Sequence, residues 1–530
     1  MQRWTLRLAI LAAGASCGAL LAAGHETEPP GDPPASAEAL SDVACVGGFA
    51  GVYPCSNVHL LSFVPLSVFG SGAASDVWGW THAEDGREYV ILGLDDGVAF
   101  VDVSDPLHPV HLGRLPTQTV SSSWSEIKVY GDHAFVVKDA AGAHGMQVFD
   151  LTRLAAVASP PETFAPDAHY AGFGKAHNIA VNEATGFAYA VGTNTCSGGL
   201  HMIDVSDPLS PAFAGCFSAD GYTPDVQCVV YLGPDADHQG QEICFASNVD
   251  TLTIVDVTVK SAPVQLSRTG YAGSGYTHQG WLTGDQRHFL LDDELDEIDF
   301  GHNSRTWVFD VSDLDAPVLA GFHDGATPAI DHNLFVVGNH VHLANYRAGV
   351  RFLRIGDLDA AELAEVAWLD TVPASDAASF AGVWGVYPFF PSGVVAASDI
   401  QSGLFLLAPD LRAVPECSDG IDDDGDGWVD AGQDPACQTA ASPRERSQCQ
   451  DGLDNDGDGR RDFDGGVSIL GAGHPDVTAP DPQCLDQPWR NRESAAKACG
   501  LGFELALLLP PLLAWRGRRK APPVATRSSR

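Results

Sequence analysis

The sequence predicts an all-β chain whose main domain is a seven-bladed β-propeller. The first observation is a recurring motif in which β-branched and aromatic residues lead into an Asp, followed by Ser or Thr and often by Asp-x-x-x-Pro. The second is that successive copies of this Asp lie about fifty residues apart, which is the period of a propeller blade. The third is that residues 57–408 read as short strands between turn signals, without a long helical period. The repeated residues are Asp102, Asp150, Asp204, Asp256 and Asp310.

The motif explains why each strand ends where it does. In 97–106 and 198–208, the Asp and Ser side chains suit hydrogen bonds to the backbone N–H groups of a turn, and Pro cannot continue a strand ladder. Two weaker copies, 349–353 and 403–407, bring the series to seven. The blades are expected to begin near Val77, Ile127, Ile179, Cys228, Gly280, Leu334 and Trp384.

The ring is expected to close through the N-terminal end of the domain. Well-preserved copies are followed by a further strand, such as 109–113, but the last copy, which ends at Leu407, is not. Segment 58–64 has the character of that missing strand and has no blade before it. We therefore expect it to complete the seventh blade, which leaves only short, protected sheet edges.

The charge of the chain excludes one class of partner. The 530 residues include 69 acidic and 29 basic side chains, a net charge of −40. Nucleic-acid-binding proteins need a basic stripe, so we expect no nucleic-acid partner. The acidity suits a secreted protein in a cation-rich setting.

The N-terminus and the cysteines indicate export. Residues 1–24 are typical of a signal peptide, with basic residues near the start, an apolar run and small residues at the end. Residues 25–41, rich in Pro, Glu and Ala, are expected to be a linker. The cysteines fit an oxidising compartment, and sequence alone leaves their connectivity open. Pairing of neighbours gives Cys45–Cys55, Cys196–Cys216, Cys228–Cys244, Cys417–Cys437 and Cys449–Cys484.

Residues 411–490 follow the propeller domain, 42–410, and carry two acidic copies, each with a Cys ahead of it. Asp at positions 1, 3 and 5 followed by Gly at position 6 is the first half of a Ca²⁺ loop. Position 12 is Gln433 or Gly465 instead of the Glu of an EF-hand, so the copies look more like thrombospondin-type or dockerin-like repeats. We expect weak Ca²⁺ binding, about 10⁻⁴–10⁻³ M, that stiffens a stalk; the alternative is a solvated acidic spacer. The expected ligands are Asp422, Asp424, Asp426, Asp430, Asp454, Asp456, Asp458 and Asp462.

Residues 491–530 form an expected anchor segment. An apolar run at 501–515 would reach about 22 Å as a helix, which is short of a hydrocarbon core of ~30 Å. The order Cys499-Gly500, apolar run, Arg cluster resembles bacterial C-terminal sorting tags, which implies sorting machinery and the outer surface membrane as partners. The alternative is a marginal membrane tail, and both interpretations place the protein at the cell surface.

Candidate chemistry lies at one end of the predicted channel. Histidines occupy equivalent positions at the start of the innermost strands of three blades. Glu126 occupies the neighbouring position at the start of another blade. Because the second strand of each blade runs antiparallel, its end returns polar residues to the same face. Convergent polar groups of this kind are candidates for a ligand or metal site, and which metal would bind is left open. The candidates are Glu126, His177, His278, Asp292 and His332, and the second strands bring Asp139, Asn248, Asp292, Glu294, Asn345 and Asp399 to this rim.

A structural role for these columns is the stronger expectation. Polar residues at blade starts often form hydrogen bonds with neighbouring blades, and repeats copy such residues for structure. The acidic run 292–297 is expected to be a solvated loop, with cation binding beside His278 as the alternative. The sequence contains no His-Glu-x-x-His, Gly-x-Ser-x-Gly, phosphate-loop or dinucleotide pattern.

Several stretches outside the repeat motif carry a resemblance to a known family. They include Trp124-Ser125-Glu126-Ile127, Ala176-His177-Asn178-Ile179, Tyr276-Thr277-His278-Gln279 and Asp331-His332-Asn333-Leu334. Over roughly 42–410 the chain resembles the choice-of-anchor B family of secreted bacterial proteins, which are built from LVIVD repeats. The resemblance implies an exported, propeller-like domain with varying C-terminal anchors and no settled activity. One departure is Pro224, where the family would be expected to have His.

Two functions from different classes are consistent with the sequence. The favoured one is a surface-anchored binding or scaffold module, with an extracellular protein or glycan as ligand. The alternative is a metal-dependent hydrolase or lyase that uses His177, His278 and His332 around a metal in the funnel. Propellers support both classes, so the fold does not decide between them.

Overall fold

The computed structural model describes residues 35–411 without a break, together with 417, 428, 432–437, 447–450, 452–454, 459–470, 472, 474–482, 484–485 and 488. It divides into two compact units, residues 1–411 and 412–530. The expected signal peptide, most of the linker and the anchor segment lie outside the described residues.

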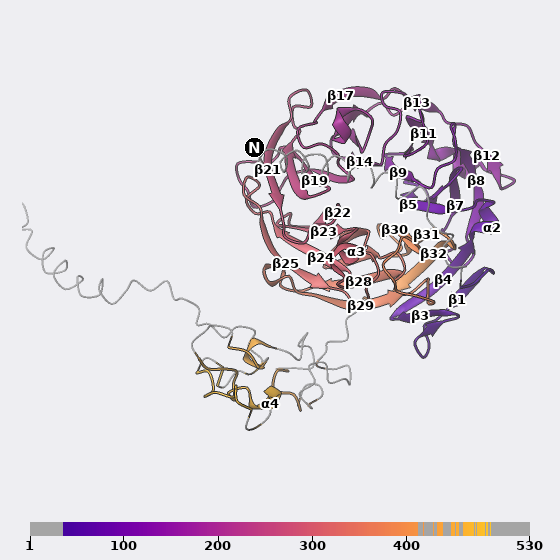
Figure 1. Ribbon diagram of the computed structural model, residues 1–530. Helices are drawn as coiled ribbons and strands as arrows, with labels where there is room; N and C mark the ends of the chain where they lie inside the picture. The colour runs from indigo at the N-terminus through magenta and orange to yellow at the C-terminus, as the bar shows by residue number, and fades with distance from the viewer. Residues whose placement is uncertain are drawn as a thin grey trace, which may run out of the picture. The chain divides into compact units, whose positions relative to one another are not determined.

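The first unit is a ring of seven β-sheets, as predicted (Figure 1). Blade 1 contains β5 (Ala74–Thr81), β6 (Glu88–Leu94), β7 (Gly97–Asp102) and β8 (Val110–Pro116). Blade 2 contains β9 (Ser125–Tyr130), β10 (His133–Lys138), β11 (Met146–Asp150) and β13 (Ala168–Tyr170). Blade 3 contains β14 (Asn178–Asn182), β15 (Phe187–Val191), β16 (His201–Asp204) and β17 (Ala212–Cys216). Blade 4 contains β18 (Asp225–Val230), β19 (Glu242–Asn248), β20 (Thr251–Asp256) and β21 (Val264–Gly270).

The remaining blades follow the same order. Blade 5 contains β22 (Thr277–Leu282), β23 (His288–Asp293), β24 (Arg305–Asp310) and β25 (Val318–Asp324). Blade 6 contains β26 (Asn333–Val337), β27 (His340–Ala344), β28 (Val350–Ile355) and β29 (Leu363–Leu369). Blade 7 contains β30 (Val383–Tyr387), β31 (Val395–Asp399), β32 (Gly403–Pro409) and β4 (Val58–Pro65). All seven predicted blade starts fall in the first strand of a blade.

Short elements extend the blades or connect their strands. Extra strands are β1 (Leu40–Val43), β2 (Phe49–Ala50), β3 (Tyr53–Ser56) and β12 (Glu162–Thr163), which pairs in parallel with β8. Within residues 35–411 the helices are α2 (Leu66–Phe69), α3 (Asp296–Phe300), η2 (Leu151–Ala156), η3 (Cys196–Gly198) and η4 (Leu358–Ala360). The described part of the second unit contains η6 (Gln448–Gln450) and α4 (Val467–Leu470). No helix among the described residues is long and apolar enough to cross a membrane.

The ring closes as the sequence predicts, because β4 pairs antiparallel with β32 and completes blade 7. Phe63 of β4 is fully buried, and its ring lies 4.6 Å from that of Phe405 on β32. Tyr53 packs edge-on against Phe405 at 5.2 Å. The N-terminal strand is therefore part of the same apolar core as the last repeat.

The repeated Asp ends the third strand of a blade by accepting a hydrogen bond from a turn. Asp102 Oδ1 accepts from the Ser104 amide at 3.0 Å, and Asp204 Oδ1 accepts from the Ser206 amide at 3.0 Å. Asp150, Asp256 and Asp310 form the same bond with the amide two residues on, at 2.8–3.0 Å. These side chains satisfy turn N–H groups that the ladder leaves unpaired.

Disulfides form between neighbouring cysteines in both units. They are Cys45–Cys55, Cys196–Cys216, Cys228–Cys244, Cys417–Cys437 and Cys449–Cys484. Cys228 and Cys244 are also register partners across β18 and β19. Disulfides persist in oxidising compartments, so the five bonds indicate an extracytoplasmic setting.

The closing contact should dominate the stability of the ring. We expect Phe63→Ala to lower the free energy of unfolding by about 3–5 kcal/mol, because it empties a fully buried aromatic site between β4 and β32. The matched control is Phe49→Ala, because Phe49 on β2 is 52% exposed. Denaturant unfolding of both variants measures the difference. Equal effects of the two substitutions would contradict a closure that depends on Phe63.

A buried histidine should make the propeller sensitive to acid. His201 on β16 lies between Tyr170 Oη and Thr195 Oγ1, at 2.9 and 2.8 Å, and burial lowers its pKa to about 4. The unfolded chain takes up the proton near pH 6.5 and the folded one does not, so this stability is lost as the pH falls from about 6.5 towards 4. We expect His201→Asn to flatten the pH dependence in that window by on the order of 1–3 kcal/mol. An unchanged slope in urea titrations from pH 7 to 4.5 would refute this assignment.

Candidate functional site

A polar hollow lies where the first strands of several blades begin. It is lined by Trp124, Glu126, His177, Asn178, His278, Glu294, His332, Asn333 and Trp384. Four of the five residues that the sequence places in the funnel are among them, and Asp292 is not. The empty volume, open solvent included, is about 270 Å³. Only a small part of this volume is enclosed by the protein, so the hollow suits an ion or a small group.

Equivalent polar side chains near the starts of the blades form hydrogen bonds to the adjacent blade. Gln279 donates from Nε2 to the Leu334 carbonyl at 3.0 Å and accepts from the Leu334 amide at 2.9 Å. Asp76 likewise accepts from the Ile127 amide at 3.1 Å. Buried backbone groups that lack ladder partners are thereby satisfied, which is the structural role expected for such columns.

Two histidines of the hollow are oriented by the next blade. His278 Nδ1 donates to the His332 carbonyl at 3.0 Å, and His332 Nδ1 donates to the Trp384 carbonyl at 2.5 Å. A carbonyl only accepts, so Nδ1 carries a proton in both rings, and the neutral form of such a ring has its lone pair on Nε2. Burial, with a smaller contribution from His177, lowers the pKa of His278 to about 3. His278 is therefore neutral at physiological pH.

Glu294 brings a carboxylate to both Nε2 atoms. Its Oε2 lies 3.9 Å from His278 Nε2, and its Oε1 lies 3.6 Å from His332 Nε2. The Tyr346 hydroxyl donates to Glu294 Oε1 at 2.7 Å and holds the carboxylate in place. All three residues are buried, and one ligand atom from each lies within 4.8 Å of the others. The arrangement offers two imidazole nitrogens and one carboxylate oxygen around a common space, which suits Zn²⁺ and similar ions.

His177 lies beside this group and has a different partner. Its ring centroid is 6.1 Å from that of His278, and its Nδ1 lies 3.3 Å from Asp139 Oδ2. Lys175 Nζ contacts the same carboxylate at 2.8 Å. Burial raises the pKa of Asp139, but the hydrogen bonds and charges of His177 and Lys175 outweigh it and hold that pKa well below its usual range. Glu294, and not His177, completes the group with His278 and His332.

Glu126 adds a carboxyl group of a different kind. Trp384 Nε1 donates to Glu126 Oε1 at 3.2 Å inside the hollow. Burial, reinforced by the negative charge of Asp76, raises the pKa of Glu126 well above its usual range. The side chain is thus suited to hold a proton close to the two histidines.

The acidic run 292–297 is not a solvated loop, so that expectation was wrong. Asp292, Asp296 and Glu297 are all buried, and Asp292 Oδ1 accepts from Thr306 Oγ1 at 3.2 Å. The run divides between two places, because Glu294 faces the hollow whereas Asp292 contacts the third strand of its own blade. The alternation of side chains along a strand could not predict that Asp292 and Glu294 lie in different places, because β23 ends at Asp293 and Glu294 lies beyond its end.

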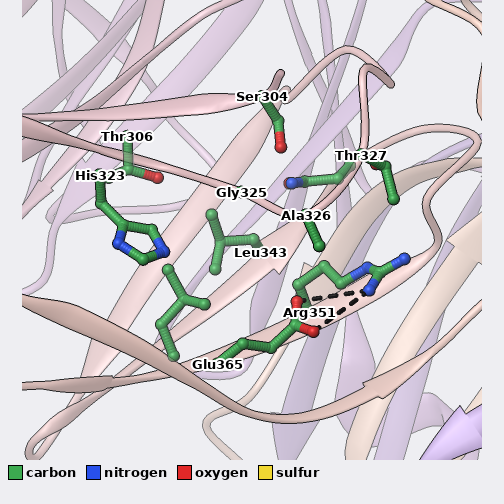
Figure 2. Close-up of a pocket in the computed structure, with 11 residues that line it drawn as sticks. Ser304, Thr306, His323, Gly325, Ala326, Thr327, Leu343, Arg351 and Glu365 are labelled. Carbon is green, nitrogen blue, oxygen red and sulfur yellow. Dashed lines mark hydrogen bonds and ion pairs between the residues drawn. The ribbon is translucent and has the colours of Figure 1, made fainter. Parts of the chain in front are cut away.

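A second pocket lies against blades 5 and 6 (Figure 2). It is lined by residues of β24, β25, β27, β28 and β29, and Figure 2 shows Arg351 paired with Glu365 at its edge. Its empty volume, open solvent included, is about 310 Å³. Thr306 and Asn345 contribute to its wall.

Most of the expected calcium ligands lie outside the described residues: Asp422, Asp424, Asp426, Asp430, Asp456 and Asp458. Two lie within them. Asp454 Oδ2 accepts from the Gly459 amide at 2.9 Å, and the buried Asp462 accepts from the Gly452 amide at 2.9 Å. These two carboxylates are held by the backbone of their own segment.

Comparison with known proteins identifies the repeat. The model of the LVIVD repeat matches residues 173–218. No curated protein matches the chain. Among solved structures, hydrazine synthase of Kuenenia stuttgartiensis is similar at 10% identity and a TM-score of 0.44, over 64% of this chain and 97% of that one. A protein from Lactobacillus plantarum is similar at 12% identity and a TM-score of 0.42, over 61% and 88%.

A third similar structure is the β-propeller domain of Cps50 (Swd1) from Myceliophteria thermophila, at 11% identity and a TM-score of 0.40, over 64% and 97% of the two chains. At these values none of the structural similarities bears on function. The matched repeat and the seven blades together support a propeller of the LVIVD-repeat type.

Proposed function

We propose that the chain is an exported binding module, held at the cell surface through its C-terminus, whose funnel binds a divalent transition metal such as Zn²⁺. The observation that carries the proposal is the group of His278, Glu294 and His332. The two Nε2 atoms lie 3.6–3.9 Å from the carboxylate oxygens of Glu294, so that one cation could take a ligand from each of the three side chains.

The hydrogen bonds around the histidines fit a metal site. Metal-bound histidines usually donate their other N–H to a carbonyl or carboxylate, which fixes the tautomer and the ring orientation. His278 and His332 both do so through the next blade. Three protein ligands leave the fourth position of a tetrahedral ion open. A carboxylate or similar oxygen group of an extracellular protein or glycan would bind there.

Glu126 favours a second candidate function, a metal-dependent hydrolase or lyase. A carboxyl group with a raised pKa near an open metal position suits a general acid. The hollow is small, so a substrate would present only a narrow group to it. Binding without turnover remains the first proposal because the rest of the hollow consists of cross-blade contacts.

Surface attachment and the calcium-stiffened stalk complete the proposal. The disulfides support an oxidising setting, and the composition of 491–530 supports recognition by sorting machinery at the outer membrane surface. The two acidic copies in 411–490 support Ca²⁺-dependent ordering of the segment that precedes the anchor.

The funnel metal has a direct test. We expect the purified chain to hold about one equivalent of Zn²⁺ after gel filtration, because His278, Glu294 and His332 are the one group of potential ligands, of three among the described residues, in which every member is buried. His278→Ala/His332→Ala should lose this metal, measured by elemental analysis. His177→Asn is the matched control, since it removes a neighbouring imidazole that is paired with Asp139, and it should retain the metal.

The same samples separate binding from catalysis. The unaltered chain and Glu126→Gln are assayed on a panel of esters, phosphate esters and glycosides. Turnover by the unaltered chain that is lost in Glu126→Gln, while the metal is retained, would establish an enzyme and overturn the proposal of a binding module. Absence of stoichiometric metal from the unaltered chain after exposure to Zn²⁺ would rule out both versions of the funnel site.

The stalk should respond to calcium in the millimolar range. We expect about 1–5 mM Ca²⁺, which covers the range of weak extracellular sites, to protect residues 411–490 of the full chain from proteolysis. Without the ion, mutual repulsion of the clustered carboxylates should keep the segment open to proteases. Asp424→Asn/Asp456→Asn should remove the protection, as measured by mass spectrometry of the fragments. If Ca²⁺ up to about 10 mM does not change the cleavage, the segment is an acidic spacer without a calcium-dependent structure.

A further inference from the structure

A histidine and two aspartates meet at the junction between blades 4 and 5. Asp235 and His238 lie in the connection between β18 and β19, and Asp315 lies in the turn between β24 and β25. One ligand atom from each residue lies within 4.8 Å of the others. His238 Nε2 is 3.3 Å from Asp315 Oδ2 and 4.0 Å from Asp235 Oδ2. Because β18 and β24 both run away from the funnel, the connections that follow them lie at the other end of the ring.

Hydrogen bonds orient the imidazole towards the two carboxylates. His238 Nδ1 lies 2.9 Å from Gln241 Oε1, and Gln241 Nε2 donates to the Asp237 carbonyl at 3.4 Å. A carbonyl only accepts, so Oε1 is the Gln241 atom that faces the ring, and His238 Nδ1 donates to it. The neutral ring then has its lone pair on Nε2, the atom that faces the aspartates. Metal-binding histidines are usually held by such a bond from their other ring nitrogen.

Backbone groups fix the two carboxylates on either side of the junction. Asp235 Oδ2 accepts from the Leu314 amide at 3.0 Å, which ties the connection in blade 4 to the turn in blade 5. The Asp315 amide donates to Asp313 Oδ1 at 3.1 Å and holds the turn that carries Asp315. The side chain of Asp315 is 62% exposed, whereas those of Asp235 and His238 are largely buried. The group is therefore preformed and open to solvent on one side.

The next junction, between blades 5 and 6, repeats this contact. The sequence Asp-Leu-Asp-Ala occurs at 313–316 in blade 5 and again at 357–360 in blade 6. Its second aspartate is Asp315 in the first copy and Asp359 in the second. His288 Nε2 of blade 5 lies 3.0 Å from Asp359 Oδ1. At both junctions the turn therefore presents an aspartate to an imidazole of the preceding blade.

The two junctions differ in the positive charge beside the aspartates. Between blades 5 and 6, Arg287 Nη2 lies 2.8 Å from Asp359 Oδ1 and 3.5 Å from Asp310 Oδ2. Between blades 4 and 5, in the part of the chain that the structure describes, no lysine or arginine forms an ion pair with Asp235 or Asp315. A guanidinium thus joins the two aspartates of one junction, and the other junction lacks this charge. A metal ion at the lone pair of the imidazole would supply it.

We propose that Asp235, His238 and Asp315 bind a Zn²⁺ ion that links blade 4 to blade 5. One imidazole nitrogen and two carboxylate oxygens are ligands that Zn²⁺ accepts, and water would take the fourth position on the solvent side. Ca²⁺ and Mg²⁺ bind oxygen ligands and would leave the imidazole unused. This site is separate from the group in the funnel, which is buried throughout. Because Asp315 is exposed, the ion at the blade junction should exchange with solvent and leave the protein during gel filtration.

The proposal is tested by equilibrium dialysis of the full chain against micromolar Zn²⁺, with millimolar Ca²⁺ present to occupy the acidic copies of the second unit. We expect His238→Gln to bind about one equivalent of Zn²⁺ less than the unaltered chain. Its Tm should also rise less with Zn²⁺, because an ion that binds only the folded chain stabilises it. The matched control is His288→Gln, which removes the equivalent imidazole beside Arg287 and should bind as much Zn²⁺ as the unaltered chain. All these proteins have the same funnel, so the difference between them does not depend on metal binding there.

A second pair of variants repeats the comparison at exposed side chains. Asp315→Asn should lose the same equivalent of Zn²⁺, whereas Asp359→Asn in the equivalent turn should keep it. The two side chains are 62% and 54% exposed, so this pair decides even if His238→Gln does not fold. Equal loss of Zn²⁺ in the variants of both junctions would overturn the proposal. Unchanged Zn²⁺ binding in Asp315→Asn would also overturn it, and the cation between the aspartates would then be a proton on His238.

Discussion

The pairing of β4 with β32 is the constraint on which the rest of the structure depends. It brings the start of the domain back to its last repeat and turns seven similar sheets into a closed ring. Only in a closed ring do the first strands of all blades begin around one channel, so that residues about fifty positions apart in the sequence face each other. The funnel therefore depends on closure of the ring, because the residues that line it come from several different blades.

A histidine in this fold can have a structural role and a functional role at the same time. His278 and His332 each use Nδ1 to satisfy a carbonyl of the following blade. The same bond directs Nε2 towards Glu294. A repeat can therefore retain histidine for blade-to-blade contact and gain an oriented metal ligand without further change. Gln279 shows the other outcome, in which both polar atoms of a side chain are used by the neighbouring backbone.

The features that could be predicted from the sequence are those with a local physical cause. The Asp of each well-preserved repeat bonds an amide two residues away, so its spacing marks strand ends and, with the two weaker copies, gives the number of blades. Neighbouring cysteines pair across short separations for the same reason. The division of the run 292–297 could not be predicted, because the donors that hold it come from distant segments. Thr306, Trp307 and the Asp331 amide lie beyond the run, and only the folded chain brings them to it.

One short acidic segment thereby contributes to two places with different donor atoms. Glu294 meets two imidazole nitrogens, whereas Asp292, Asp296 and Glu297 accept hydrogen bonds from the Thr306 hydroxyl, the Trp307 indole and the Asp331 amide. The backbone that joins these carboxylates runs from β23 into α3, so the position of each carboxylate limits that of the other. The hydrogen bond from the Asp331 amide to Glu297 and the carboxylate of Glu294 that faces the histidines are therefore linked through the same short stretch of chain.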